Sequence, residues 1–159
     1  MPTAHLLFGL VGSGKTTLAR DLEQRHRAVR FTPDEWMARL FGENPPADTF
    51  PQHAAVILDL MEPVWTRCLT LGIDVVLDYG FWRRTERDQA RRVVESCGAR
   101  ALLYKVECPE DEARRRVAAR NGHADRSLFI APETFDVLRE RLEPLHADEV
   151  FIAAVPKPT

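Results

Sequence analysis

One segment near the start of the chain, residues 9–16, reads Gly-Leu-Val-Gly-Ser-Gly-Lys-Thr and matches the pattern G-x-x-x-x-G-K-[ST] in full. The apolar run at residues 5–10 is typical of a buried strand, and the spacing of Leu18 and Leu22 predicts a helix over residues 14–24. Glycines let the loop between them wrap tightly, so that backbone N–H groups and the positive end of the helix point at one phosphate. We therefore expect a phosphate-binding loop made by Gly9, Gly12, Ser13, Gly14, Lys15, Thr16 and Thr17.

Two side chains of this loop carry chemistry of their own. The Lys15 ammonium is placed to reach the β- and γ-phosphates of a nucleoside triphosphate, and the Thr16 hydroxyl is placed to bind Mg²⁺. The expected cofactors are therefore ATP and Mg²⁺. The residues of the loop do not distinguish ATP from GTP.

Apolar and amphipathic segments alternate along the whole chain, without a linker between two cores. Further strands are expected at residues 29–32, 73–78, 101–107 and 150–155, and further helices at residues 33–41, 51–71, 83–97, 109–120 and 132–142. This alternation predicts an α/β fold of three layers, in which a mostly parallel sheet has helices on both faces and binds its ligands beyond the carboxyl ends of the strands. A chain of 159 residues suits one domain, residues 1–159.

Composition limits the classes of partner. Hydrophobic residues at 45% and charged residues at 29% are those of a globular protein, and a formal net charge of −2 makes nucleic acid an unlikely general partner. No apolar run approaches the ~18 residues of a membrane span, and the first residues do not resemble a signal peptide. Cys68, Cys97 and Cys108 show no metal-ligand spacing, which favours a reducing compartment, so a cytoplasmic protein is expected. The oligomeric state is not indicated.

Acidic residues follow two of the expected strands. Asp34 and Glu35 come just after the second strand, and Asp78 ends the third. Phosphoryl transfer to an alcohol uses one carboxylate to orient or deprotonate the hydroxyl and commonly a second near the metal ion. We expect Asp34 and Asp78 to share these roles at the acceptor, with Asp78 also near Mg²⁺, and the residues alone leave open which is the base. An acid in the first turn of a helix can also simply compensate the helix dipole.

The residues after Asp78 form the second part of the expected acceptor site. Phe81, Trp82 and Arg83 follow Gly80 on a loop at the predicted mouth of the site. The two aromatic rings suit a wall for an apolar or ring-bearing substrate. Packing of these rings against the sheet is an equally good interpretation.

Arginines gather on the helix expected at residues 109–120. Arg116 and Arg120 are four residues apart and so share one face of that helix. A guanidinium near the γ-phosphate would neutralise charge that develops during transfer, and another could stack on an adenine. Asn121 and Gly122 follow as a possible hinge, so we expect a small arginine-bearing lid at about residues 118–132.

Four blocks together resemble the small P-loop kinases of the AAA-33 type, which are related to chloramphenicol phosphotransferase, zeta toxins, gluconate kinase and the polynucleotide 5′-kinase domain. The blocks are LLFGLVGSGKTTLA, FTPDEW, VVLDYGFW and VECPEDEARRRVAARN. The resemblance implies a five-stranded parallel sheet in the order 2-3-1-4-5. It also implies that Asp34 is the base, that Arg116 lies beside the adenine and Arg120 at the transferred phosphate, and that Val155 and Pro156 border the base of the nucleotide.

The chain departs from some branches of this group. It lacks the D-G-x-P-R signature of adenylate kinases and is far shorter than zeta toxins.

The main hypothesis is an ATP- and Mg-dependent kinase that phosphorylates a hydroxyl of a small molecule, such as an antibiotic, a sugar or another metabolite. One alternative is a polynucleotide or nucleoside 5′-hydroxyl kinase that uses a basic track of Arg83, Arg84, Arg87, Arg91 and Arg92. Another is a nucleotide-dependent switch or binding module without an acceptor.

Overall fold

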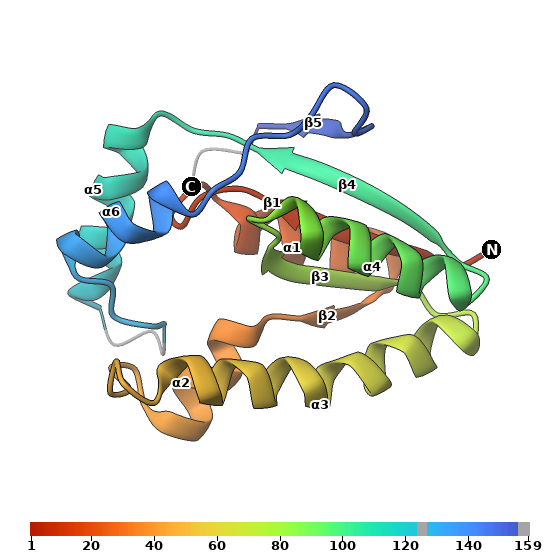
Figure 1. The fold of residues 1–159 in the computed structure, drawn as a ribbon, viewed down its shortest axis with the longest axis horizontal. Helices are drawn as coiled ribbons and strands as arrows, with labels where there is room; N and C mark the ends of the chain where they lie inside the picture. Colours follow the sequence, from red (N-terminus) through yellow and green to blue (C-terminus); the bar gives the residue numbers. More distant parts are fainter. Residues whose placement is uncertain (124–126, 156–159) are drawn as a thin grey trace.

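The strand that leads into the glycine loop, β1 (Thr3–Phe8), lies at the centre of the sheet. The computed structural model describes residues 1–123 and 127–155. In it β1 pairs in parallel with β3 (Val75–Gly80) and with β4 (Arg100–Val106). The strands β2 (Val29–Phe31) and β5 (Ile152–Ala154) complete the edges, so the order is β2-β3-β1-β4-β5, as Figure 1 shows. The predicted parallel sheet and its order are confirmed.

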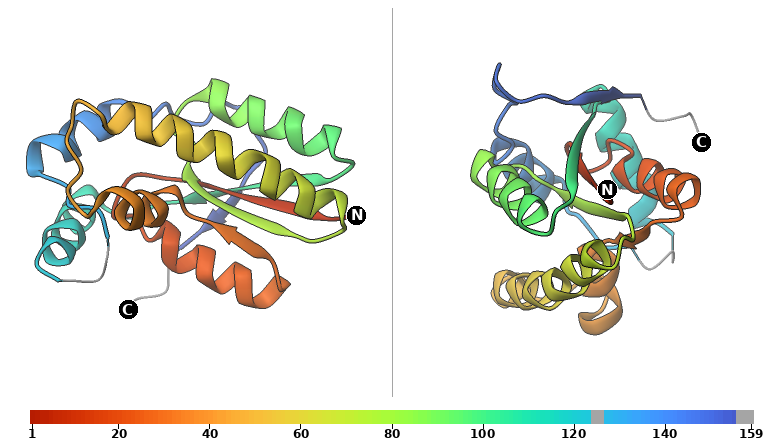
Figure 2. Two further views of the ribbon diagram at one scale, coloured as in Figure 1. Left: turned by 90° about the horizontal axis from the view of Figure 1, so that it is seen from below. Right: turned by 90° about the vertical axis from the view of Figure 1, so that its right-hand side faces the viewer.

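Helices cover both faces of this sheet. Helix α1 (Lys15–His26) packs on one face, while α3 (Phe50–Thr70) and α4 (Arg84–Ser96) pack on the other (Figure 2). Helix α2 (Pro33–Phe41) packs against α3. Helices α5 (Glu110–Asn121) and α6 (Pro132–Glu140) lie together beyond the carboxyl ends of the strands (Figure 1).

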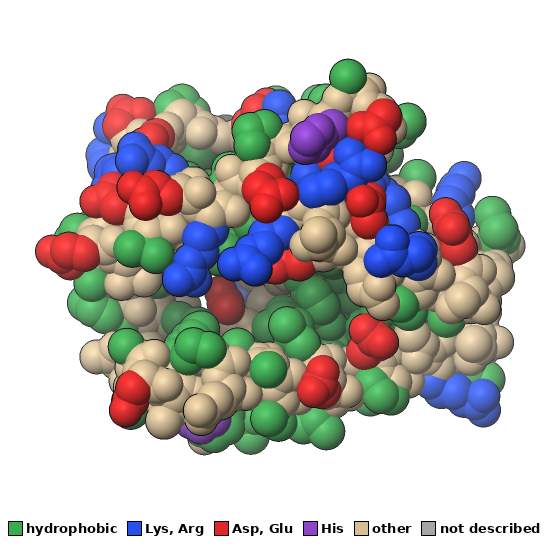
Figure 3. All heavy atoms as spheres, viewed as in Figure 1, with side chains coloured by type: hydrophobic (Ala, Val, Ile, Leu, Met, Phe, Trp, Pro, Cys, Tyr) green, Lys and Arg blue, Asp and Glu red, His purple; other side chains and the backbone are tan. Residues whose placement is uncertain are grey.

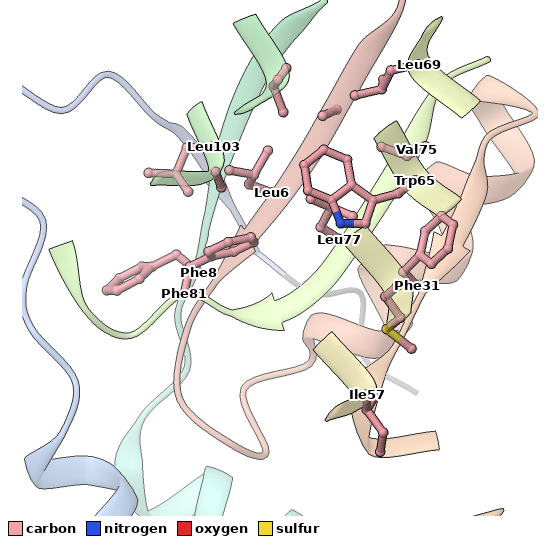
Figure 4. Packing of buried hydrophobic residues seen from close by; sticks show 14 of the residues in the cluster. Leu6, Phe8, Phe31, Ile57, Trp65, Leu69, Val75, Leu77, Phe81 and Leu103 are labelled. Atoms are coloured by element: carbon pink, nitrogen blue, oxygen red, sulfur yellow. The ribbon is translucent and has the colours of Figure 1, made fainter. Parts of the chain in front are cut away.

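The central strand is apolar on both faces because each face meets a helix layer. Leu6 and Phe8 pack with Trp65 of α3 and with Leu77 in the larger core cluster, which Figure 4 shows from close by. The alternate residue Leu7 packs toward α1 instead. This double burial fixes the end of β1, and therefore the start of the glycine loop.

Strand boundaries differ from the sequence prediction by one or two residues, and two of these differences matter for the site. β1 ends at Phe8, two residues earlier than expected, because Gly9 and Leu10 already belong to the loop. β3 continues to Gly80, so Asp78 lies inside the strand and not at its end. None of the helices formed by residues 1–123 and 127–155 combines the length and apolar character that crossing a membrane requires.

Candidate active site

The glycine loop forms a tight backbone turn between β1 and α1. Gly12 and Gly14 have φ angles of 78° and 102°, which residues other than glycine rarely adopt. A Cβ on Gly9 would stand 2.5 Å from the carbonyl oxygen of Val106. The first turn of α1 carries no acidic residue, so the positive end of the helix remains available to an anion.

The polar atoms of the loop also suit the binding of a phosphate group. Ser13 is 1% exposed, and its hydroxyl oxygen has no hydrogen-bond partner among the described residues. Lys15 donates to the carbonyl oxygen of Leu10 at 2.8 Å, within the same loop. Hydroxyl, ammonium and backbone N–H groups are the donors that triphosphates require. The donor set therefore suits the nucleotide that the sequence predicts.

A buried carboxylate lies against the loop from β3. Asp78 is 7% exposed, and its Oδ2 accepts hydrogen bonds from the Thr16 hydroxyl at 2.8 Å and from the Thr32 hydroxyl at 3.2 Å. Arg30 in turn donates to the Thr32 oxygen. Hard oxygen donors of this kind are those that Mg²⁺ prefers. Thr16 and Asp78, predicted as metal ligands, are thus brought into direct contact.

Thr32, at the N-cap position of α2, is a site residue that was not predicted. Its hydroxyl makes no capping hydrogen bond and is turned toward Asp78. Sequence reasoning missed this role because a threonine before Pro-Asp is an ordinary start of a helix. The spacing of two residues between Thr32 and Asp34 at the end of a strand is the signal that could have indicated a site residue.

Asp34, in the first turn of α2, lies in the electrostatic field of the same loop. It is open to solvent, but the surrounding protein removes part of the hydration of its carboxylate and so raises its pKa; Asp78 also raises this pKa, while Lys15 and Arg120 lower it. Desolvation lowers the pKa of the Lys15 ammonium, whereas Asp78 and Asp34 raise it. Two carboxylates and two cations therefore interact around one loop.

This raised pKa gives a stability prediction. Because the pKa of Asp34 is higher in the folded than in the unfolded chain, its ionisation at neutral pH disfavours the folded state. Asp34→Asn should therefore raise the Tm of the protein without metal and nucleotide at pH 7. The gain should shrink as the pH falls through the raised pKa, as followed by calorimetry. A Tm equal to that of the wild type at pH 7 would contradict this assignment.

The arginines of α5 differ in whether an acidic side chain binds them. Arg114 is bound to Asp136 and Glu110, Arg115 to Asp111, and Arg116 to Glu112. The Nε atom of Arg120, in contrast, is buried without a hydrogen-bond partner among the described residues. Arg120 is therefore the arginine of this helix with a buried donor still available for a phosphate.

Phe81 and Trp82, the two rings of the predicted aromatic wall, have different surroundings in the structure. Phe81 is 4% exposed and belongs to the core cluster, where it stacks on Tyr79. Trp82 donates from its indole Nε1 to the carbonyl oxygen of Gly9 at 2.9 Å, so its ring supports the glycine loop. Arg83 precedes the first turn of α4 and is exposed. Val155, expected near the nucleotide base, follows β5 and is exposed, and Pro156 lies outside the described residues.

The arginines of the hypothetical basic track are largely neutralised. Arg84 makes two hydrogen bonds to Asp148, at 2.9 and 2.8 Å, and Arg91 pairs with Asp88 and Glu149. Arg87 is fully buried and binds both carboxylate oxygens of Glu149, each at 2.8 Å. These ion pairs neutralise three of the five arginines of the hypothetical track, while exposed Arg92 binds, among the described residues, only the side-chain amide of Gln89.

Arg87 is a structural residue that the sequence reasoning missed. It also donates to the carbonyl oxygens of Phe81 and Trp82, and thereby holds the segment that supports the glycine loop. Its spacing with Ala90 and Val94, three and seven residues later, places it on the buried face of α4. That spacing could have indicated a core position, but the partner Glu149 lies 62 residues away.

Comparisons with known proteins agree with this fold. No curated protein matches the sequence. A solved structure from Chloroflexus aurantiacus, provisionally described as a kinase, has a TM-score of 0.76 at 16% identity, with 97% of this chain and 88% of the other covered. Kti12 from Chaetomium thermophilum in complex with ADP-AlF3 has a TM-score of 0.73 at 18% identity, with 97% and 89% covered. A gluconokinase from Sinorhizobium meliloti has a TM-score of 0.67 at 16% identity, with 99% and 85% covered.

At such identities the likeness shows the fold, which is that of the P-loop kinases. The family described as AAA domain, AAA-33, matches residues 5–145, which is most of the chain. The matched region contains the glycine loop, Asp34, Asp78 and Arg120. The chain therefore belongs to the AAA-33 family.

Proposed function

We propose that the protein is an ATP- and Mg-dependent phosphotransferase that moves the γ-phosphate to a hydroxyl of a small molecule. The observation that carries the proposal is the convergence of Lys15, Asp34, Asp78 and Arg120 around one glycine loop. A module that only binds nucleotide needs the loop and the metal ligands. It has no need of a second, solvent-open carboxylate beside them.

Each of these groups has a separate role in the proposed reaction. Asp34, open to solvent, takes the proton of the acceptor hydroxyl, whose oxygen then bonds to the γ-phosphorus as the bond from this phosphorus to ADP breaks. Lys15 and Arg120 neutralise the charge of the transferred group. Thr16 and Asp78 would hold Mg²⁺, which supplies further neutralisation of the phosphates.

Two features of the structure favour a small acceptor. The backbone N–H of Phe129 donates to the carbonyl oxygen of Glu43 at 2.8 Å, so the segment before α6 is tied to the loop between α2 and α3. Figure 3 shows a hollow in this face of the molecule, with basic side chains on its upper rim and an acidic side chain inside. A bounded hollow suits a sugar, an antibiotic or a similar metabolite better than a polymer.

The names of similar structures are compatible with a small acceptor. One of them is a gluconokinase, whose name denotes a small hydroxylated acceptor. The polynucleotide alternative has less support here, because Arg84, Arg87 and Arg91 of its five-arginine track are bound to acids of the same chain.

An ATP-consumption screen tests the function directly. The purified protein is incubated with ATP, Mg²⁺ and a panel of alcohol-bearing antibiotics, sugars and nucleosides, and products are examined by mass spectrometry for one added phosphate. We expect at least one small hydroxyl compound to raise ATP consumption and to gain that phosphate. ATP hydrolysis that no acceptor changes, with a protein partner bound only in the presence of ATP, would instead identify a switch.

A further inference from the structure

Three potential metal ligands meet near the amino ends of the strands, at the end of the sheet opposite to the glycine loop. His5 lies in β1, His26 is the last residue of α1, and Asp74 comes just before β3. One donor atom from each of these side chains lies within 4.8 Å of the other two. Nothing in the proposed phosphotransfer uses these residues.

His5 is the most informative of the three because it is 1% exposed. Its Nδ1 lies 2.9 Å from the hydroxyl oxygen of Tyr104, while its Nε2 is buried without a hydrogen-bond partner among the described residues. A buried polar nitrogen without a partner is uncommon and calls for an explanation. If Nδ1–H donates to Tyr104, the lone pair of Nε2 faces the other two side chains.

The other two side chains leave donor atoms available on this side. Asp74 accepts a hydrogen bond from the backbone N–H of Thr3 through Oδ1 at 2.8 Å, and its Oδ2 lies 4.0 Å from Nε2 of His5. The ring of His26 lies with its centroid 4.4 Å from that of His5. His26 is exposed at a helix end, so its ring can turn at little cost.

We propose that His5 Nε2, His26 and Asp74 Oδ2 bind a divalent transition-metal ion of the zinc class, with water as a fourth ligand. Two imidazoles and one carboxylate are a donor set that suits Zn²⁺. Donors around a tetrahedral Zn²⁺ stand about 3.3 Å apart, so binding requires a modest contraction of the cluster. The exposed His26 can supply most of that movement. Tyr104 orients His5 from behind, as outer hydrogen-bond partners of metal-bound histidines commonly do.

The local charges bear on the affinity. Burial lowers the pKa of His5 to about 4, with His26 and Arg100 acting in the same direction and Asp74 in the opposite one. Arg100 repels a cation and Asp74 attracts it, so these two charges oppose each other.

Such an ion would join three segments that are distant in sequence: β1, the end of α1 and the start of β3. An ion that binds only the folded chain raises the Tm in proportion to its affinity and concentration. The metal would act on stability, since it lies at the other end of the strands from Asp78 and the phosphate loop.

The test uses the full chain freed of metal with a chelator, without nucleotide. Zn²⁺ binding is measured by calorimetric titration, Tm is measured with and without Zn²⁺, and Co²⁺ serves as a spectroscopic probe of four-coordinate binding. We expect one equivalent of Zn²⁺ to bind and to raise the Tm. The variants His26→Ala and Asp74→Asn should each weaken binding by at least about tenfold.

Matched controls separate this site from others. His123→Ala removes an exposed histidine on another element, and Asp78→Asn removes the proposed magnesium ligand; both should leave the affinity for Zn²⁺ within about twofold of the wild type. Tyr104→Phe keeps the ring but removes its hydroxyl, and should weaken binding by about 10- to 100-fold. The proposal is overturned if the wild type binds no Zn²⁺, or if His26→Ala binds it as tightly as the wild type.

Discussion

Asp34→Asn should lower the turnover number for phosphoryl transfer by about 10²–10⁴-fold, the usual contribution of a general base. Asparagine keeps the shape of the side chain but cannot accept the proton of the acceptor hydroxyl. The glycine loop, Thr16 and Asp78 are unchanged in this variant, so the Kd for ATP should stay near that of the wild type. Turnover is measured with the acceptor found in the screen, and nucleotide binding by titration.

The neighbouring carboxylate offers a control for this experiment. Glu35 follows Asp34 in the same first turn of α2, but it is bound to Arg30 at 3.0 Å and to Arg20 at 3.4 Å. Glu35→Gln should therefore change turnover by less than about threefold, since the Glu35 carboxylate is already engaged by arginines and is not available to an acceptor hydroxyl. If Asp34→Asn retained full turnover, or if the two variants lost the same activity, Asp34 would not be the base.

Much of the fold could be predicted because its causes are local. The glycine pattern, the alternation of apolar and amphipathic segments, the proline that opens α2 at residue 33 and the C-cap Gly42 all act within a few residues of the chain. Helix α2 accordingly begins and ends where the sequence predicts. The sheet order followed from the family resemblance, since local patterns do not determine which strands become neighbours.

The site was only partly predictable, because its geometry depends on contacts between distant segments. Asp78 could be recognised as an acid near the end of a strand, but its contact with Thr32 joins residues 46 positions apart. Phe81 and Trp82 were indistinguishable in sequence, whereas the positive φ of 47° at Phe81 turns its ring into the core and leaves Trp82 beside Gly9. Tertiary packing made that distinction.

The second large effect is expected at Arg87, whose guanidinium is fully buried against Glu149. Arg87→Met should lower the free energy of unfolding by about 3–5 kcal/mol, because it leaves the Glu149 carboxylate buried without its main partner. Urea unfolding measures this loss. Arg115→Met provides the control: Arg115 binds the exposed Asp111, and such pairs are worth about 1 kcal/mol or less. Equal losses in the two variants would contradict the assignment.

Acid should weaken the same ion pair in the wild type. The hydrogen bonds from Arg87 are the main cause that lowers the pKa of Glu149 to about 2, from an ordinary value of 4.5. A lowered pKa in the folded state gives stability that is present above the ordinary value and is lost as the pH falls toward the lowered one. The difference in unfolding free energy between wild type and Arg87→Met should therefore decrease between about pH 4.5 and pH 2.

A double variant separates the stability of this pair from its effect on the site. Replacing both partners, as Arg87→Met with Glu149→Met, removes the unpaired carboxylate and should restore most of the lost stability, since apolar replacements of buried ion pairs are often neutral. The carbonyl oxygens of Phe81 and Trp82 would still lack the donor that holds them. Because Trp82 supports Gly9, ATP binding should remain weaker than in the wild type even where stability has returned. Wild-type affinity for ATP in the double variant would show that Arg87 acts on the stability of the fold alone.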